Sequence, residues 1–408
     1  MGPLALMAKE AGFKVFGSDL AEGAVSGELF RKEIPFRVGE QDGKYLQEVY
    51  DTFGVDWFVH TSALPPDHPE LVLARKLGIR VSKRDELIAF LIDKLGLRLV
   101  AVAGTHGKTT TTAMIIWACQ ELSIPVSYLV GTTLPFAGAG RFTPGSKFMV
   151  YEADEYDRNF LHFSPWLAVI PAVSYDHPDI YPTVADYERA FAKFRGQSEE
   201  VIEGDDVPKE VSAGLMLSGE FRRKDAGLAV MAISRMLEEL GRDFSISEIV
   251  EAINQFPGVG RRFERIALGV YTDYAHHPEE IAATLQLAEE EVVSQGLSGV
   301  VAVYEPHQNT RQHQIREGYP AAFSGFSKLA RVFWLPTYLT REDMSLPVIT
   351  PEEFVSDLGL DIAEGAELGD SLAEELIRLR DEGNLILLMT AGPADAWFRK
   401  VFARETKP

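Results

Sequence analysis

The residues whose spacing most clearly indicates chemistry lie at 104–110, where the sequence reads GTHGKTT. Glycines there would let backbone N–H groups turn toward phosphate oxygens, and a helix starting after them would add its positive end. Lys108 would place a cation against the β- and γ-phosphates, and the hydroxyl of Thr109 can bind Mg²⁺. The glycine spacing is shorter than in the common G-x-x-x-x-G-K-[ST] loop, and a plain Gly/Thr-rich turn is the alternative. We predict a site for a nucleoside triphosphate with Mg²⁺.

Acidic side chains follow a later strand-like run, in the sequence Glu152-Ala153-Asp154-Glu155. Carboxylates at a strand's C-terminal end beside a phosphate loop are where a second metal contact belongs, although a solvated acidic turn is an equal alternative. His177 follows the next strand-like run, so it should emerge at the same edge of the sheet. A lone histidine is more often structural than a ligand. Because Glu152 and His177 would end neighbouring strands, we favour a metal site.

Further polar clusters lie in the last third of the chain. Arg261 and Arg262 could clamp phosphate as two planar, permanently charged groups, or they could be ordinary surface residues. Residues 272–278 and 304–311 are rich in His, Asp and Arg and follow strand-like runs. Such concentrations are unusual in an otherwise acidic protein and indicate a second set of binding groups.

The overall composition limits the class of protein. The 408 residues carry 40 basic and 61 acidic side chains, a formal charge of −21, which disfavours nucleic acid as a partner because such binding needs a basic surface. Cys119 is the only cysteine, so an internal disulfide or a cysteine metal cluster is excluded. No apolar run reaches the roughly 18 residues that span a membrane, and no signal peptide is evident. We expect a cytoplasmic protein with small-molecule substrates and no membrane partner, as a monomer or weak homo-oligomer.

Alternating strands and helices must position these motifs. Strand-like runs fall at 13–17, 57–60, 97–103, 147–151, 166–170, 299–304, 332–335 and 384–389. Helical patterns lie between them, including those near 229–240 and 246–254, and this alternation predicts parallel α/β sheets. The acidic, turn-rich residues 199–209 are predicted to form a loop. We predict three α/β domains, at 1–94, 95–256 and 257–408.

The start of the chain is unusual for such a fold. A dinucleotide-binding type of domain begins with a strand and a glycine-rich turn, whereas residues 4–11 have a helical pattern. We therefore expect a Rossmann-like N-terminal domain whose first strand is missing, through a misassigned start or a truncation. A central phosphate-loop ATPase domain and a Rossmann-like C-terminal domain would follow it.

Taken in order along the chain, these elements resemble the Mur ligase family, ATP-dependent enzymes that form amide bonds in peptidoglycan assembly. The resemblance covers nearly the whole chain. It rests on GSD at 17–19, TSA at 61–63, GTHGKTTTT at 104–112, EADE at 152–155, DH at 176–177, FPGVGRRFE at 256–264, DYAHHP at 273–278 and PH at 306–307. It implies that ATP phosphorylates a substrate carboxylate, giving an acyl phosphate and ADP, and that an amine then displaces phosphate.

The same resemblance implies roles for individual residues. The catalytic ones would be Lys108, His177, Arg262 and His307. ATP would be bound by Gly104, Thr105, His106, Gly107, Lys108, Thr109, Thr110, Arg262 and Asp273. Mg²⁺ would be held by Thr109, Glu152 and His177. The UDP-sugar and the amino acid would contact Ser18, Asp19, Ser62, Tyr274, His276, His307 and Arg311.

One departure from the family pattern limits which of the family's reactions we expect. Later members carry a carbamylated lysine in the helix after the Asp-His motif, and the matching position here is Phe191. The members that add the first amino acid, and those that recycle muropeptides, also lack this lysine. We therefore expect an enzyme that joins UDP-N-acetylmuramate to L-alanine. The alternatives are a recycling ligase that adds a ready-made tripeptide and a catalytically weak, nucleotide-binding regulator.

Three other departures bear on these alternatives. The central domain looks shortened, because only an acidic loop is expected between Phe194 and Leu217. The G-x-H-N-x-x-N stretch that contacts adenine in the family is GEFRRKD at 219–225, where Asp225 could accept from the adenine amino group. The family's PHRYSRT is PHQNTRQ at 306–312, which lacks the first arginine and is similar to the recycling branch.

Overall fold

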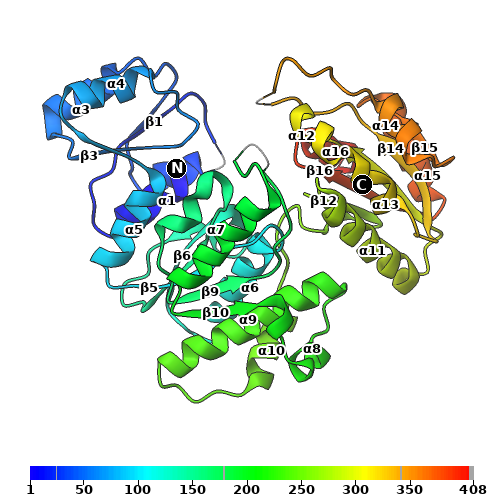
Figure 1. Ribbon diagram of the computed structural model, residues 1–408, viewed down its shortest axis with the longest axis horizontal. Coiled ribbons are helices and arrows are strands. Elements are labelled where there is room, and N and C mark those ends of the chain that lie inside the picture. Colours follow the sequence, from blue (N-terminus) through cyan, green and yellow to red (C-terminus); the bar gives the residue numbers. More distant parts are fainter. Residues whose placement is uncertain (24, 178–179, 341, 404–408) are drawn as a thin grey trace. The chain divides into compact units, whose positions relative to one another are not determined.

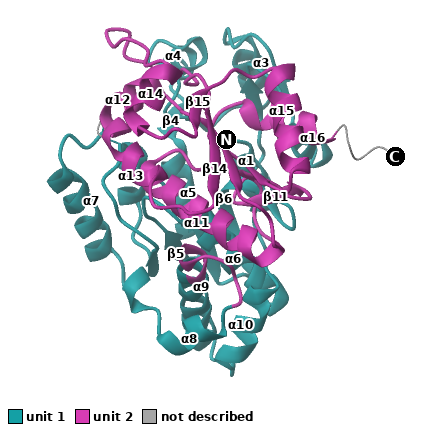
Figure 2. Cartoon of the chain, turned by 90° about the vertical axis from the view of Figure 1, so that its right-hand side faces the viewer, with its two compact units in different colours: residues 1–215, 224–256 teal, residues 216–223, 257–408 magenta. Residues whose placement is uncertain are grey.

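The computed structural model describes residues 1–23, 25–177, 180–340 and 342–403. Contacts within the chain divide it into two compact units, which Figure 2 shows in different colours. Unit 1 consists of residues 1–215 and 224–256, and unit 2 of residues 216–223 and 257–408. Unit 1 thus contains most of what the sequence divides into an N-terminal and a central domain. The domain boundaries at 94 and 256 stay predictions.

The first part of unit 1 is built from parallel pairs of strands joined by helices (Figure 1). β1 (Gly17–Asp19) pairs with β2 (Phe36–Val38), and β3 (Trp57–His60) pairs with β4 (Arg80–Lys83). Parallel neighbours need crossover connections, which α2 (Ser26–Arg31) and α4 (Pro69–Lys76) supply. The remaining helices of this part are α1 (Gly2–Glu10), α3 (Lys44–Phe53) and α5 (Arg84–Lys94).

The chain opens on a helix, as the sequence predicts. In α1, Leu4 and Met7 are buried in the core of unit 1 together with Ile88. The carboxylate of Glu10 accepts a hydrogen bond from the backbone N–H of Phe142 at 2.9 Å. This helix is therefore an integral part of the core.

The strand predicted at 13–17 is wrong for most of its length, because β1 begins only at Gly17. Phe13 packs edge-on against Phe90, and Val15 joins the same core. These apolar side chains are thus buried by a connecting segment. Their burial does not require the backbone pairing that defines a strand.

A six-stranded sheet forms the second part of unit 1. Its strands are β5 (Arg98–Val102), β6 (Val126–Leu134), β7 (Gly138–Arg141), β8 (Phe148–Glu152), β9 (Leu167–Ile170) and β10 (Glu200–Glu203), in the order β10-β9-β5-β8-β6-β7. Only β7 runs antiparallel to its neighbour. The strands predicted at 97–103, 147–151 and 166–170 are confirmed. Since β5 is buried between β8 and β9, the loop that follows it starts from a rigid position.

The helices of this part are α6 (Lys108–Glu121), α7 (Val184–Gln197), α8 (Lys209–Gly214), α9 (Glu220–Glu239) and α10 (Ile246–Asn254). Ser245 caps α10: its hydroxyl accepts from the N–H of Glu248, whose carboxylate accepts from the N–H of Ser245. This confirms the helix start that the sequence predicts. Cys119, in α6, and Phe191, in α7, are completely buried. Phe191 packs against Phe160 and therefore belongs to the apolar core.

The loop predicted at 199–209 is wrong. Residues 200–203 form β10, which pairs in parallel with β9 at the edge of the sheet, and residues 204–206 form a short 3₁₀ helix. In β10 the side chain of Ile202 is buried, whereas Glu200 is exposed. An edge strand presents one side to water, so its acidic composition resembles that of a loop. The segment between Phe194 and Leu217 therefore holds a strand and α8.

Unit 2 is built on a second six-stranded sheet. Its strands are β11 (Glu264–Ala267), β12 (Val270–Asp273), β13 (Val300–Glu305), β14 (Leu329–Trp334), β15 (Ala363–Gly365) and β16 (Leu385–Thr390), in the order β11-β12-β16-β13-β14-β15. All neighbours are parallel except β11 and β12. The strands predicted at 299–304, 332–335 and 384–389 are confirmed.

Helices cover both faces of this second sheet. On one face lie α11 (Pro278–Gln295), α13 (Tyr319–Phe323) and α14 (Pro351–Leu358), and on the other lie α15 (Asp370–Asp381) and α16 (Ala394–Ala403). The short helix α12 (Asn309–Ile315) follows β13. The arrangement is the doubly wound α/β type that the sequence predicts. Among helices in the described ranges, none combines the length and apolar character needed to cross a lipid bilayer.

Candidate active site

The loop between β5 and α6 requires glycine at two positions. Gly107, the residue before α6, has φ of +81°, and a Cβ there would lie 2.5 Å from a carboxylate oxygen of Asp225 and 2.8 Å from the Cβ of Pro171. A Cβ on Gly104 would lie 2.7 Å from the backbone oxygen of Ala172. Both positions are packed by other segments of unit 1, so the loop backbone is held in one conformation. Asp225, expected near adenine, therefore lies beside the start of α6.

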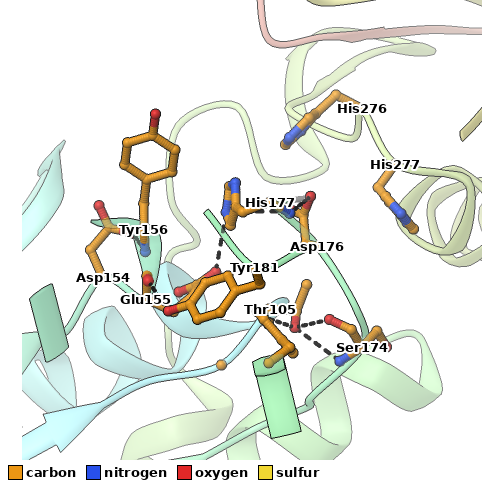
Figure 3. Close-up of polar contacts among 12 residues, drawn as sticks. Thr105, Asp154, Glu155, Tyr156, Ser174, Asp176, His177, Tyr181, His276 and His277 are labelled. Atoms are coloured by element: carbon orange, nitrogen blue, oxygen red, sulfur yellow. Dashed lines mark hydrogen bonds and ion pairs between the residues drawn. The ribbon is translucent and has the colours of Figure 1, made fainter. Parts of the chain in front are cut away.

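Thr105 fastens the loop to the segment that follows β9, as Figure 3 shows. Its hydroxyl donates to the backbone oxygen of Ser174 at 2.6 Å and accepts from the N–H of Ser174 at 2.9 Å. Since that hydroxyl has only one proton, the hydroxyl of Tyr187, 2.7 Å away, must donate to it. The backbone of His106 forms an antiparallel bridge with Ala172. These contacts fix the first half of the loop.

The ammonium group of Lys108 is held inside the loop. It donates to the backbone oxygens of Gly104 at 2.5 Å and Thr105 at 3.3 Å, and it lies 2.8 Å from the carboxylate of Glu155. These three acceptors match its three N–H donors. Burial alone would lower the pKa of Lys108, but the nearby carboxylates of Glu155, Asp154 and Glu152 together raise the pKa above its ordinary value. The loop thus carries a fixed positive charge.

Glu155 is a functional candidate that the sequence interpretation did not select. Its side chain is 1% exposed and lies 3.6 Å from Nε2 of His177 (Figure 3). It also contacts Lys108. Burial alone would raise the pKa of Glu155, but Lys108 and His177 lower it below the ordinary value. The sequence shows this residue within the EADE motif. It does not show which of the three carboxylates there turns toward the lysine.

Thr109 and Glu152 come together as the sequence predicts. The hydroxyl of Thr109, in the first turn of α6, donates to Glu152 at the end of β8 at 2.7 Å. The second oxygen of Glu152 accepts from the N–H of Gly131, also at 2.7 Å. Hydroxyl and carboxylate oxygens are the type of ligand that Mg²⁺ prefers. These residues therefore fit the metal that the family resemblance implies.

His177 lies near the carboxylate that pairs with Lys108, since its Nε2 is 3.6 Å from Glu155. Its ring is 3.6 Å from the carboxylate of Asp176 and contacts the ring of Tyr156 at a centroid distance of 5.2 Å. Its backbone has φ of +56°, a conformation that is uncommon outside glycine and often marks functional positions. A role of His177 as a metal ligand stays a prediction.

The residues expected near the UDP-sugar lie at the ends of β1 and β3. Ser18 donates to the buried carboxylate of Glu70 at 2.7 Å and accepts from the side chain of Gln41 at 3.0 Å. Asp19 accepts from the N–H of the residue that follows it. Ser62 is exposed in the turn after β3. The link from Ser18 to Glu70 was not predicted, because these residues are 52 positions apart.

In unit 2, Asp273 anchors the turn that carries the two arginines. Its carboxylate accepts from the N–H of Phe263 at 2.6 Å and from the N–H of Ala275 at 2.7 Å. Burial raises the pKa of Asp273, and the nearby charge of Arg262 partly opposes this. The guanidinium group of Arg262 lies over the ring of Tyr274, at 5.0 Å from its centre. Contact of Arg262 or Asp273 with ATP stays a prediction.

His276 and His307 meet at the C-terminal edge of the unit 2 sheet. Their ring centres are 6.2 Å apart in an edge-to-face arrangement, and the ring of His307 also contacts that of Tyr338. Nδ1 of His276 lies 3.1 Å from the backbone oxygen of Tyr274 and 3.2 Å from the carboxylate of Glu280. The two later motifs of the sequence are thus brought together by the fold. Arg311, from the same motif, belongs to α12.

Two protein-family models match the chain. One, described as "Mur ligase family, catalytic domain", covers residues 1–94, and the other, "Mur ligase middle domain", covers residues 102–213. Together they span the N-terminal strands, the phosphate loop and the carboxylates that follow β8.

Two curated relatives match over most of their length. The UDP-N-acetylmuramate–L-alanine ligase of Thermobifida fusca is 31% identical, with 96% of this chain and 91% of that protein covered. The ligase of the same name from Lactiplantibacillus plantarum is 29% identical, with 90% and 88% covered.

Solved structures share the fold. The UDP-N-acetylmuramate–alanine ligase MurC of Thermotoga maritima has a TM-score of 0.73 at 22% identity, with 99% of this chain and 96% of that chain covered. A murein peptide ligase of Psychrobacter arcticus has a TM-score of 0.60 at 20% identity, with 99% and 95% covered. The predicted class, α/β with three domains, is confirmed.

Proposed function

Because the chain belongs to the Mur ligase family, we propose that it is an ATP-dependent ligase that joins the carboxyl group of UDP-N-acetylmuramate to the amino group of L-alanine. The observation that carries this proposal is the arrangement in the loop between β5 and α6, where Lys108 pairs with Glu155 and the adjacent Thr109 donates to Glu152. ADP and inorganic phosphate would be the other products. The reaction would supply a peptidoglycan precursor in the cytoplasm.

The reaction would take place in two displacements. In the first, a carboxylate oxygen of the acceptor attacks the γ-phosphorus of ATP, the bond to the β,γ-bridging oxygen breaks, and ADP leaves. In the second, the amine of L-alanine attacks the acyl carbon, loses a proton, and expels phosphate from a tetrahedral intermediate. Charge on the transferring phosphoryl group must be neutralised in the first displacement. The ammonium group of Lys108 would do this after exchanging a bond to the protein for a bond to phosphate.

Thr109, Glu152 and His177 are the residues that we propose to hold Mg²⁺. The metal would neutralise charge on the phosphates when bound. The protein's own contribution is to orient these side chains. For Glu152, a hydrogen bond from the N–H of Gly131 holds the carboxylate. Glu155 would hold both Lys108 and His177 in place.

We assign the amino acid to the residues at the C-terminal edge of the unit 2 sheet. His276, His307 and Arg311 offer ring nitrogens and a guanidinium group suited to a zwitterion, and Tyr274 lies among them. Ser18, Asp19 and Ser62 would contact the UDP-sugar. Arg262 and Asp273 would contribute to ATP binding from the turn that they stabilise.

A direct assay tests this proposal. The purified protein is incubated with ATP, Mg²⁺, UDP-N-acetylmuramate and one amino acid at a time, while phosphate release and the mass of the product are measured. We expect phosphate release with L-alanine and a product whose mass equals that of both substrates less water. Phosphate release with none of the substrates, despite ATP binding, would favour the regulator.

A recycling ligase is the second candidate, favoured by the fold likeness to the murein peptide ligase and by the sequence at 305–310. The assay includes L-alanyl-γ-D-glutamyl-diaminopimelate as an alternative amine. Exclusive use of this tripeptide would replace the first candidate with the second.

A further inference from the structure

A series of buried side-chain hydrogen bonds connects the two histidine-bearing segments of unit 2. It begins at the backbone oxygen of His276, passes through the hydroxyls of Tyr304 and Tyr319 and the carboxamide of Gln312, and ends at the backbone oxygen of His307. The successive distances are 3.2, 2.9, 2.5 and 2.9 Å. Tyr304 and Gln312 are 0% exposed and Tyr319 is 1% exposed, so water does not compete for these bonds.

The proton inventory fixes the direction of this series. The amide nitrogen of Gln312 donates to the backbone oxygen of His307, so its oxygen faces Tyr319 and can only accept. The hydroxyl of Tyr319 must therefore donate its single proton to Gln312. Within the series, the proton of Tyr304 is then shared between Tyr319 and the backbone oxygen of His276. Each member thus depends on the next.

Burial keeps both hydroxyls protonated. It raises the pKa of Tyr304 well above its ordinary value, and it also raises the pKa of Tyr319. Neither group would ionise in the neutral range. The series therefore acts as a fixed connection over the range in which an enzyme of this kind works.

The segment that contains His307 depends on such a connection, because its backbone is irregular. Gln308 has φ of +65°, and its N–H donates to the backbone oxygen of Tyr338 at 2.8 Å. Tyr338 in turn donates from its N–H to Pro306 at 2.8 Å. Hydrogen bonds to the backbone of Tyr338 thus hold one side of this segment. The hydrogen bond from Gln312 to the backbone oxygen of His307 holds the other side.

We propose that Tyr304, Tyr319 and Gln312 are positioning residues that set the spacing of His276 and His307 for the amine substrate. The substrate part of this inference rests on the proposed function. The tyrosines and the glutamine act through the two backbone oxygens. Loss of one member would shift the histidine segments and weaken binding of the amino acid while leaving ATP binding intact.

Kinetics of three variants test the substrate part. Tyr319→Phe removes one hydroxyl, and Gln312→Met removes the amide at nearly constant volume. Tyr271→Phe is the matched control: it also removes the hydroxyl of a buried tyrosine in unit 2, but one bonded to Glu291 and Gln295. We expect Tyr319→Phe and Gln312→Met to raise KM for L-alanine on the order of tenfold, with KM for ATP unchanged and Tyr271→Phe like the parent.

Carbonyl NMR shifts test the hydrogen bonds in the whole protein without any activity. Labelling histidine carbonyls with ¹³C and the nitrogens of His and Gln with ¹⁵N gives one His–His pair, 276–277, and two His–Gln pairs, 307–308 and 313–314. In Tyr319→Phe the carbonyl of His307 should shift upfield, because Gln312 is held less firmly. The carbonyl of His276 should shift downfield, because it gains the whole proton of Tyr304. The His313 carbonyl serves as an internal control.

The outcomes separate this inference from the proposed function. Opposite shifts of the two carbonyls together with the selective rise in KM support it. It is overturned if the carbonyl signals move no more than in Tyr271→Phe, or if they move while KM for L-alanine stays within about twofold of the parent. If the parent protein does not use L-alanine, the proposed function fails, and the carbonyl shifts alone decide whether the series positions the two segments.

Discussion

The ammonium group of Lys108 lies 2.8 Å from the carboxylate of Glu155. The charge of this lysine is thus paired with that of a carboxylate of the protein itself. Breaking a buried ion pair by removing one partner is costly, because it leaves the other charge uncompensated. If Lys108 binds nucleotide as we propose, the pair connects the stability of unit 1 with that binding.

Replacing the loop lysine should abolish turnover. Lys108→Ala leaves the charge on the transferring phosphoryl group unneutralised, and we expect phosphate release to fall by at least about 10²–10³-fold. Lys147→Ala is the control, since Lys147 makes a partly exposed ion pair with Glu239 elsewhere in unit 1. Activity in Lys108→Ala close to that of the control would refute the assignment of the phosphate loop.

Removing the charge of Glu155 should destabilise the nucleotide-free protein. Glu155→Gln leaves Lys108 without its anion, and we expect a loss of up to about 3–5 kcal/mol in the free energy of unfolding. ATP with Mg²⁺ should restore more stability to the variant than to the parent, because phosphate replaces the lost carboxylate. Denaturant unfolding with and without nucleotide measures both effects.

The single variant Lys108→Met and the double variant Lys108→Met/Glu155→Gln complete the cycle. Because the double variant removes both charges, it should be more stable than Glu155→Gln alone. A double variant destabilised by the sum of the two single effects would show that the two side chains do not interact energetically.

His177→Ala should increase the requirement for Mg²⁺. If His177 holds the metal, its loss should raise the Mg²⁺ concentration for half-maximal activity by about 10–100-fold. The matched control is His162→Ala, which alters an exposed histidine in the 3₁₀ helix Tyr156–His162. If the Mg²⁺ dependence of activity is unaltered in His177→Ala, His177 is not a metal ligand and its role is structural.

A methyl group at Gly107 should disrupt the loop. Gly107→Ala would place its Cβ against Asp225 and Pro171 and would force a left-handed backbone at a cost of about 1–2 kcal/mol before any clash. Gly196→Ala, in α7, meets nothing within 4 Å and should be neutral or stabilising by up to about 1 kcal/mol. Unfolding curves and ATP affinity measured for both variants test this contrast. Equal behaviour of the two would argue against a tightly packed loop.

The ion pair between Arg399 and Glu264 should make stability depend on pH. Burial alone would raise the pKa of Glu264, but hydrogen bonds from Arg399 and from the N–H of Arg261 lower it below 4.5. A lowered pKa means that this stabilisation is present above pH 4.5 and is lost as the pH falls through the lower, folded-state value.

Arg399→Gln should therefore cost about 1 kcal/mol at pH 7, since both groups are partly exposed, and the difference should shrink below pH 4.5. Unfolding of both proteins between pH 7 and pH 3 measures the two differences. If the difference in the free energy of unfolding between the parent and Arg399→Gln stays constant over this range, the ionisation of Glu264 is not involved.

Much of the site could be predicted because it depends on strand order. Thr109 and Glu152 follow β5 and end β8, and parallel neighbours bring their C-terminal ends to one edge of a sheet. The start of α10 was equally predictable, because a capping box is a local interaction between Ser245 and Glu248. Both cases require only the type of residue and its distance along the chain.

What could not be predicted depends on the backbone conformation of single residues. Asp157 and Arg158, directly after the EADE motif, both have positive φ, which no pattern of residue types indicates. The direction of Glu155 follows from this turn and from packing of Tyr181, whose hydroxyl donates to the backbone oxygen of Glu155 at 2.6 Å. The edge strand β10 was missed for another reason, because its exposed glutamates imitate the composition of a loop.

The burial of Cys119 has a practical consequence for labelling experiments. This sole thiol is 0% exposed in α6, and burial raises its pKa, so little of the reactive thiolate is present. Maleimide reagents should therefore leave it unmodified in the folded protein. A single cysteine introduced on the surface of either unit can carry a fluorophore or spin label, with the native residue kept in place. Opening of α6 would then be reported by the appearance of a second reactive thiol.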